Sequence, residues 1–205
     1  WGATRVAKFW EKQAQKKLPK PEKKRARPQE ILDGLRQAVP DDVLLTTDVG
    51  SHKILASLDW PTLAPNKFML SNGLSCMGYG VPAAIASSLA LSHGPTVALT
   101  GDGGFGMILG ELNLIHELNT PVIIVIMNDE ALDLIRSAQT RSERETFGTE
   151  FTNPDFKKIA QAYDLTFAKV RSAEECREAV SKAIAENRPL IVEALIDPKS
   201  YPTTP

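Results

Sequence analysis

Residues 97–129 read VALTGDGGFGMILGELNLIHELNTPVIIVIMND. Two short apolar runs in this stretch, at 97–100 and 121–127, are separated by about one helix's length of chain. Such runs, rich in branched residues, are typical of a βαβ unit in a parallel sheet. Asp102 and Asp129 follow the two predicted strands, where open α/β sheets bind their ligands. The stretch therefore predicts a site for a phosphate group and a metal ion.

The rest of the chain repeats this alternation of strands and helices. Asn153 is expected to cap a helix with Pro154 at its first position, and Ser172 with Glu175 forms a capping box for another. The chain has no glycine or proline directly after Asp129, so it is expected to run straight into a helix there. Further strands are expected at 43–47, 67–70, 165–170 and 189–196. Helices are expected at 28–39, 81–91 and 107–118, and another follows residues 48–52 and reaches about Leu58. We therefore expect an α/β fold with a mostly parallel sheet and helices on both faces.

The composition excludes several classes of protein. The 205 residues carry 24 Lys and Arg against 25 Asp and Glu, a balance that disfavours nucleic-acid binding. Cys76 and Cys176 lie far apart without metal-binding spacing, so two free thiols in a reducing compartment are expected. No apolar run reaches the length of a membrane span. We expect a soluble, cytoplasmic protein with no nucleic-acid or membrane partner.

Residues 1–27 differ in composition from the rest of the chain. The first eighteen residues have apolar positions at helical spacing, and residues 16–27 hold seven basic residues with Pro19 and Pro21. A basic run of this kind is typical of an exposed linker between domains. Together with the missing initial Met, it predicts a fragment of a longer protein. Residues 1–27 would then be the end of a preceding domain with its basic linker, and residues 28–205 one domain.

The glycine turn after the first strand of the opening stretch allows several interpretations. A Gly-Asp-Gly triplet alone marks an ordinary turn. Gly101, Gly103 and Gly106 also satisfy the loose G-x-G-x-x-G spacing of a nicotinamide-binding fingerprint. Glycines let backbone N–H groups approach a phosphate, and acids at two adjacent strand ends suit Mg²⁺, which prefers oxygen ligands. The acid within the turn and the pair Asn128-Asp129 favour a metal and diphosphate site over a dinucleotide site.

Several ordered motifs together resemble one known family. Gly101-Asp102-Gly103 followed by Asn128-Asp129 is similar to the thiamine-diphosphate signature, which runs from Gly-Asp-Gly to Asn-Asn. DVGSH at 48–52, SNGLSCMGYGVPAA at 71–84 and FGM at 105–107 resemble the acetolactate synthase and pyruvate oxidase branch. The resemblance covers about residues 28–197 and implies the thiamine-diphosphate-binding fold of a C-terminal domain. Residues 1–27 then resemble the end of the middle domain.

The resemblance implies a role for each matching position. Asp102, Asp129 and the backbone carbonyl of Ala131 would hold Mg²⁺. Gly73 would meet the aminopyrimidine through its backbone, and Met77 would lie under the thiazolium and force the bent cofactor conformation. The residues implied to bind the cofactor are Gly50, Ser51, His52, Gly73, Met77, Gly101, Gly103, Gly104 and Phe105. Without the resemblance, Met77 would be an ordinary core methionine and His52 a helix-start residue.

The chain departs from the family pattern in three respects. Asp129 replaces the second Asn of the signature, which adds a carboxylate but keeps an oxygen ligand for the metal. Ala138 stands where biosynthetic acetolactate synthases usually carry an aromatic residue before Gln139, which leaves the acceptor open. The Glu that activates the cofactor lies, in this family, on a pyrimidine-binding domain, usually of a partner subunit. No catalytic residue is therefore expected in this chain, and a homodimer or homotetramer is implied.

These implications lead to one preferred function and three alternatives. The preferred function is Mg²⁺-dependent binding of thiamine diphosphate, as the C-terminal domain of an acetolactate synthase-like transferase or lyase. The whole enzyme would decarboxylate a 2-oxo acid such as pyruvate and transfer the two-carbon unit, whereas this chain alone would have little or no turnover. The alternatives are a stand-alone cofactor-binding subunit, another 2-oxo acid decarboxylase or lyase, and a nicotinamide-dependent oxidoreductase.

Overall fold

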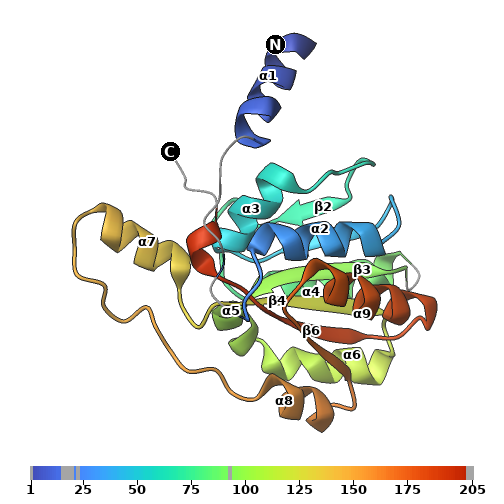
Figure 1. The fold of residues 1–205 in the computed structure, drawn as a ribbon. Helices are drawn as coiled ribbons and strands as arrows, with labels where there is room; N and C mark the ends of the chain where they lie inside the picture. The colour runs from blue at the N-terminus through green and yellow to red at the C-terminus, as the bar shows by residue number, and fades with distance from the viewer. Residues whose placement is uncertain (1, 15–20, 22–23, 92–93, 202–205) are drawn as a thin grey trace.

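A six-stranded sheet forms the centre of the protein (Figure 1). The structure is a computed structural model and describes residues 2–14, 21, 24–91 and 94–201. The strands lie in the order β2-β1-β3-β4-β6-β5, and all five pairings are parallel. Their bounds are β1 (Leu44–Thr47), β2 (Phe68–Leu70), β3 (Thr96–Gly101), β4 (Val122–Asn128), β5 (Thr166–Val170) and β6 (Leu190–Leu195). The predicted parallel α/β sheet is confirmed.

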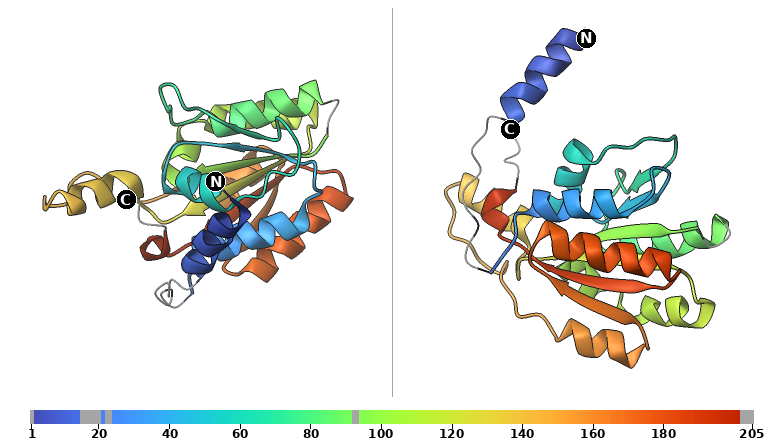
Figure 2. Two further views of the ribbon diagram at one scale, coloured as in Figure 1. Left: turned by 90° about the horizontal axis from the view of Figure 1, so that it is seen from above. Right: turned by 45° about the vertical axis from the view of Figure 1, so that its right-hand side comes forward.

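Helices cover both faces of the sheet, as Figures 1 and 2 show. One face carries α2 (Pro28–Ala38), α3 (Ser51–Asp59) and α9 (Ala173–Ala185). The other face carries α4 (Gly80–Ala90), α6 (Leu112–Leu118) and α8 (Phe156–Ala162). This two-sided cover explains why β4 is buried along its whole length and apolar at every position except its last, Asn128.

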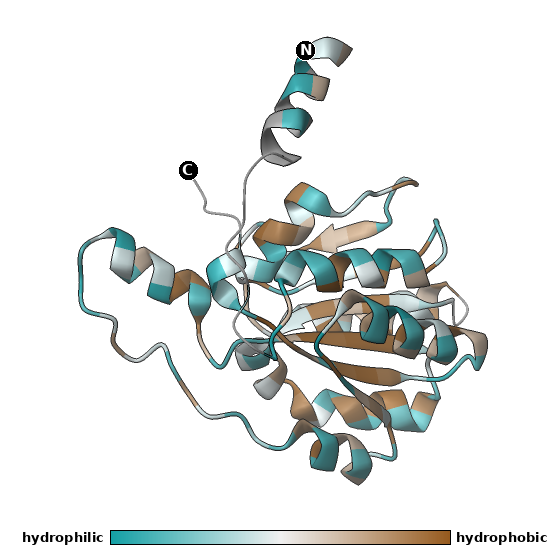
Figure 3. Cartoon of the chain, in the orientation of Figure 1, coloured by the Kyte–Doolittle hydropathy of each residue, from teal (hydrophilic) through white to brown (hydrophobic). Residues whose placement is uncertain are grey.

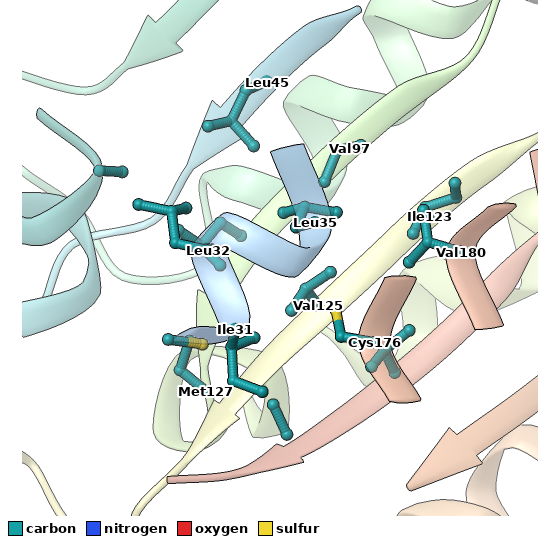
Figure 4. Close-up of a cluster of buried hydrophobic side chains, with 14 of the residues drawn as sticks. Ile31, Leu32, Leu35, Leu45, Val97, Ile123, Val125, Met127, Cys176 and Val180 are labelled. Carbon is teal, nitrogen blue, oxygen red and sulfur yellow. The ribbon is translucent and has the colours of Figure 1, made fainter. Parts of the chain in front are cut away.

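The core beneath α2 shows how the sequence builds these layers (Figure 4). Ile31, Leu32 and Leu35 recur at helical spacing and pack onto the sheet. Every second residue of β4 faces this core, and the residues between them face the opposite core. Burial of one Leu or Ile side chain contributes about 1.5–3 kcal/mol, so each layer adds substantially to stability. Figure 3 shows the result, with apolar strands inside and mixed polar helices outside.

The helix predicted over 107–118 is wrong in its bounds. The chain becomes helical directly after β3, as α5 (Asp102–Gly106), and continues through the 3-10 turn η1 (Leu109–Glu111) into α6. This early turn requires Gly104, because a Cβ there would lie 2.3 Å from the Asp48 Oδ2 atom. The glycine turn is therefore a tightly packed helical turn.

The helix expected directly after Asp129 is also wrong. Glu130 has a φ of +59°, which breaks the strand direction, and Ala131 pairs with Glu150 in an isolated antiparallel bridge. Helix α7 begins only at Asp133 and ends at Arg141. It projects from the sheet, and an extended segment leads from it to α8 (Figure 1).

The helix cap predicted at Asn153 is wrong, because Asp155, two residues later, caps α8. The Asp155 carboxylate accepts hydrogen bonds from the amides of Lys157 and Lys158, at 3.0 and 3.2 Å, and so caps α8. Asn153 is thereby released for another role. At Ser172 the predicted cap is confirmed, since its hydroxyl accepts from the Glu175 amide at 3.2 Å. The second bond of the predicted capping box differs, because the Glu175 carboxylate accepts from the amide of Arg171, at 2.7 Å.

The N-terminal part is described only in pieces. Helix α1 (Ala3–Ala14) stands apart from the sheet (Figures 1 and 2), and the predicted extension of this helix to residue 18 lies outside the described residues. Most of the predicted basic linker, at 15–20 and 22–23, lies outside them as well. Ala26 does belong to the sheet region, because it forms a parallel bridge with Ile196. In the part of the chain that the structure describes, no helix has the length and apolar character to cross a membrane.

Candidate functional site

The sheet has a topological switch between β1 and β3. From β1 the chain moves outward to β2 through α3, whereas from β3 it moves the other way to β4 through α5 and α6. The loops after these two strands diverge onto opposite faces and leave a crevice at their carboxyl ends. A cavity of about 280 Å³ lies there, and residues that follow β1, β3 and β4 line it.

This cavity brings together most of the predicted site residues. Those that line it are Gly50, Ser51, His52, Met77, Gly101, Asp102, Gly103, Gly104, Asp129 and Ala131. Gly73 and Phe105 are not among the lining residues. Gly73 lies exposed between β2 and α4, and the Phe105 side chain is buried edge-on against Phe156, with ring centroids 5.3 Å apart. The side chain of Phe105 therefore belongs to the core.

Asp48 anchors the wall of the cavity that follows β1. Its buried carboxylate accepts hydrogen bonds from the amides of Val49, Gly78 and Tyr79, at 3.0, 2.8 and 3.2 Å. The Thr100 hydroxyl donates a fourth bond, at 3.2 Å. Four donors satisfy the buried charge and join three loops around one carboxylate. The sequence had placed Asp48 in a family motif without a role.

His52 is a buried imidazole with an unused nitrogen. Burial lowers the pKa of His52 to about 4, so the ring is neutral near neutral pH. Its Nε2 atom is buried and has no hydrogen-bond partner among the described residues. Gly50 and Gly101 give the ring its space, because a Cβ on either would lie 2.6 or 3.2 Å from the His52 Cε1 atom. A buried nitrogen of this kind needs a hydrogen-bond partner, which an ordered water or a group of a bound ligand would supply.

The hydroxyl of Ser51 is already engaged. It donates to Asp133 Oδ2 at 2.6 Å, and Arg136 donates to the other oxygen of Asp133 at 2.9 Å. This chain of contacts ties the start of α7 to the start of α3. A wider cleft of about 720 Å³ adjoins the cavity and shares Ser51, Asp133 and Tyr201 with it.

Asp102 and Asp129 form the acidic end of the cavity. The pKa of Asp129 is raised to about 8, first by burial and then by the negative charges of Asp102 and Asp133. The positive charge of Arg136 lowers this pKa by a smaller amount. Burial also raises the pKa of Asp102, although donated hydrogen bonds oppose the rise. Two neighbouring carboxyls with raised pKa values favour a cation between them, because its charge would stabilise both ionised forms.

A third protein ligand would have to come from the backbone. Within the residues that the structure describes, no three Asp, Glu, His or Cys side chains converge on one metal position. Ala131 lines the cavity together with the two acids, and its backbone carbonyl is the predicted third ligand. Two carboxylates and a carbonyl are the hard oxygen donors that Mg²⁺ prefers.

Asn153 holds the acidic end in place, a role that the sequence did not reveal. Its Nδ2 atom donates to Asp102 Oδ2 at 2.7 Å and to Asn128 Oδ1 at 3.1 Å. The Glu130 amide donates to the same two oxygens, at 2.8 and 3.2 Å. The motif Asn-Pro-Asp at 153–155 was the local sign of this role in the sequence. Either Asn153 or Asp155 could cap the helix, so one of the two side chains was left for another contact.

Glu193 orients Asn128 from behind. This buried carboxylate of β6 accepts from Asn128 Nδ2 at 2.8 Å, and Lys169 of β5 lies 2.9 Å from its other oxygen. The contact fixes the orientation of the Asn128 amide. Its carbonyl oxygen therefore points toward the amide of Glu130 and the side chain of Asn153.

We expect Asn153→Ala to weaken metal binding about 10- to 100-fold, the range for removal of a partner that orients a metal ligand. The substitution frees Asp102 Oδ2 from one of its two donors, which also raises the pKa of Asp102 further. The measurement is the Mg²⁺ concentration that half-saturates cofactor binding. Asn113→Ala is the matched control, because Asn113 is exposed and its side chain donates to Glu117 on α6, at 2.7 Å. An unchanged Mg²⁺ requirement in Asn153→Ala would contradict this role.

Comparison with known proteins identifies the family of the chain. Residues 48–194 match the family described as "Thiamine pyrophosphate enzyme, C-terminal TPP binding domain". The chain belongs to the thiamine pyrophosphate enzymes. The matched segment of this thiamine pyrophosphate-binding domain extends from Asp48, the anchor of the cavity wall, to Ala194 near the end of β6.

Several similar proteins are acetolactate synthases of bacteria, archaea and fungi. Acetolactate synthase of Bacillus subtilis is 32% identical over 173 residues, which cover 84% of this chain and 30% of that protein. The probable acetolactate synthase large subunit of Methanococcus aeolicus is 33% identical, over 85% of this chain and 30% of that protein. The mitochondrial acetolactate synthase catalytic subunit of Saccharomyces cerevisiae is 32% identical, over 87% of this chain and 26% of that protein. This thiamine pyrophosphate-binding domain thus spans less than a third of its relatives' length.

Proposed function

We propose that this chain binds thiamine diphosphate through Mg²⁺, as the C-terminal domain of an acetolactate synthase-like enzyme. One observation carries the proposal: two carboxyls from adjacent strand ends, Asp102 and Asp129, meet in a cavity at the switch point of the sheet. The raised pKa of Asp129 supports a cation at this position. Asp102, Asp129 and the Ala131 carbonyl would hold the metal.

The diphosphate would lie against the glycine turn and His52. Gly103 and Gly104 line the cavity and carry no side chain that would block a phosphate group. His52 lines the same cavity, and its buried, unpartnered Nε2 atom would hydrogen-bond the anion. Gly50 and Gly101 would approach through their backbone, as would Ser51, whose hydroxyl is held by Asp133.

The organic part of the cofactor would extend toward Met77. This half-buried residue lines the cavity, and a Cβ on Gly103 would lie 3.4 Å from its Cε atom. Met77 therefore lies against the glycine turn, where it would support the thiazolium. Gly73 and the backbone of Phe105 stay proposed contacts outside the lined cavity. When bound, thiamine diphosphate supplies the electron sink for loss of carbon dioxide from a 2-oxo acid.

The acid in the glycine turn disfavours the nicotinamide alternative. In a dinucleotide fold the pyrophosphate lies directly on such a turn, at a helix N-terminus. Here Asp102 begins α5 and is held toward the cavity by the amides of Gly103 and Glu130. Without a metal ion, its carboxylate would repel a pyrophosphate.

The parent enzyme is proposed from the relatives. It would decarboxylate a 2-oxo acid such as pyruvate in the cytoplasm, as a homodimer or homotetramer, and Ala138 leaves the acceptor open. A pyrimidine-binding domain of a partner subunit would supply the activating Glu, so the chain alone would have little or no turnover. Residues 1–27 would be the end of the preceding domain with its basic linker. A stand-alone subunit that acts with such a domain on another chain is the alternative.

We expect the chain to bind thiamine diphosphate with Mg²⁺ present and to lose it in excess EDTA. The two acids of the site need a cation before an anionic diphosphate can approach them. Isothermal titration with thiamine diphosphate, and with NAD as the control ligand, measures this. Binding that persists in excess EDTA would contradict the metal assignment.

Two substitutions at one position sharpen the test. Asp129→Asn keeps a side-chain oxygen for the metal, and it should retain Mg²⁺-dependent binding. Asp129→Ala removes that oxygen and should lose binding. Equal binding by the two variants would show that position 129 does not contact the metal.

A further inference from the structure

The loop between two proposed metal ligands has one residue that sets its shape. Glu130 lies between Asp129 and Ala131 and has a φ of +59°, a conformation that non-glycine residues rarely adopt. Its amide donates to Asp102 Oδ2 at 2.8 Å and to Asn128 Oδ1 at 3.2 Å. A change in the position of Glu130 would therefore move all three proposed protein ligands of the metal.

Arg25, from the segment before α2, forms an ion pair with Glu130. One guanidinium nitrogen lies 2.6 Å from Glu130 Oε2. Another donates to the Ile196 carbonyl at 3.0 Å and to the Asn128 carbonyl at 3.4 Å. The planar group thus joins the end of β4, the end of β6 and the metal loop, which the fork of donors of an arginine allows and a lysine does not.

The neighbouring residue fixes Arg25 in turn. Ala26 is buried, its amide donates to the Leu195 carbonyl, and its carbonyl accepts from the Asp197 amide, both at 2.9 Å. These bonds extend the sheet by one residue of the N-terminal segment, beside Ile196. Backbone pairing of Ala26 therefore fixes the position of the chain next to Arg25, from which the guanidinium extends.

Arg25 acts on the loop by position and not by its charge on the acids. The contacts of its guanidinium go to Glu130 and to the carbonyls of Asn128 and Ile196. Glu130 takes up the charge of Arg25 in a partly exposed ion pair, and pairs of this kind add little to stability. Removal of Arg25 should therefore change loop geometry much more than overall stability.

We propose that Arg25 is a positioning residue for the metal site, through which the segment preceding α2 controls Mg²⁺ affinity. The inference rests on the proposed function, because it concerns the same metal. It assigns a role at the site to a residue outside the predicted domain of 28–205. A displacement of the N-terminal segment would release Glu130 and weaken the metal site.

The test uses the full 205-residue chain and two measurements. The first is the Mg²⁺ concentration that half-saturates binding of thiamine diphosphate, and the second is the denaturant midpoint of unfolding in EDTA. We expect Arg25→Ala to raise the Mg²⁺ midpoint about 10-fold, with little change in unfolding. Arg25→Lys, which can replace only part of the fork, should give an intermediate value.

Arg27→Ala is the matched control, since Arg27 pairs with Glu30 of α2, at 3.4 Å. It should leave the Mg²⁺ midpoint unchanged. In a double-mutant cycle, Glu130→Gln should have a smaller effect when Arg25 is already Ala, because both substitutions break one contact. Equal midpoints for the wild type and Arg25→Ala, or fully additive effects in the cycle, would overturn the inference alone. A wild-type chain without Mg²⁺-dependent binding would overturn the proposed function together with it.

Discussion

Gly104→Ala should destabilise the protein by about 2 kcal/mol and abolish cofactor binding. The new methyl group would lie 2.3 Å from Asp48 Oδ2 and 3.2 Å from the Thr100 hydroxyl. The Asp48 carboxylate cannot move aside freely, because four donors hold it. Overpacking of this kind costs about 1–3 kcal/mol, occasionally more. The gain in helix propensity from Gly to Ala is at most about 1 kcal/mol, so the clash prevails.

Gly106→Ala is the control for this substitution. Gly106 ends the same short helix, and a Cβ there would meet nothing within 4 Å. Its denaturant midpoint should stay at or slightly above that of the wild type, with an unchanged m-value. If Gly104→Ala were as stable as Gly106→Ala, Asp48 would not be the rigid anchor that the structure indicates. Thiamine diphosphate titration of both variants then reports on the cavity itself.

Glu193→Ala should cost about 2 kcal/mol of stability and also weaken Mg²⁺ binding. The substitution leaves the buried Nδ2 group of Asn128 without its acceptor, and an unsatisfied buried donor costs about 1–3 kcal/mol. Lys169 is 44% exposed and returns to water, so the lost ion pair adds little. Because Asn128 also orients the Glu130 amide and Asn153, the disturbance reaches Asp102.

Glu193→Gln separates the hydrogen bond from the charge. The amide oxygen of Gln can still accept from Asn128, so its stability loss should stay below about 1 kcal/mol. Chemical unfolding in EDTA and the Mg²⁺ midpoint of cofactor binding are the two measurements. If both variants lost the same stability, the charge on Glu193 would matter more than the acceptor it offers to Asn128. If neither changed the Mg²⁺ midpoint, Asn128 would not transmit the effect to the metal site.

Local patterns predicted much of the fold because their physical causes are local. The apolar run at 121–127 became β4, since a strand buried on both faces needs apolar residues at every position. The two helices that were wrong, at 107–118 and directly after Asp129, lie at the ends of two central strands. There the chain path depends on Gly104 beside Asp48, and on Glu130 beside Asp102, contacts between residues far apart in the sequence.

The sequence by itself determined the parallel α/β sheet and the family, and it located two acids at neighbouring strand ends. It could do so because alternation, glycine turns and strand-end acids are patterns within short stretches of chain. Only the tertiary structure decided what supports those acids. Asn153, Glu193 and Arg25 reach the site across 51, 65 and 105 positions of sequence. Apart from the Asn-Pro-Asp motif at 153–155, no local pattern marks these residues, because their partners are set by how the strands and loops pack together. The same packing took the Phe105 side chain into the core and left Gly73 outside the lined cavity.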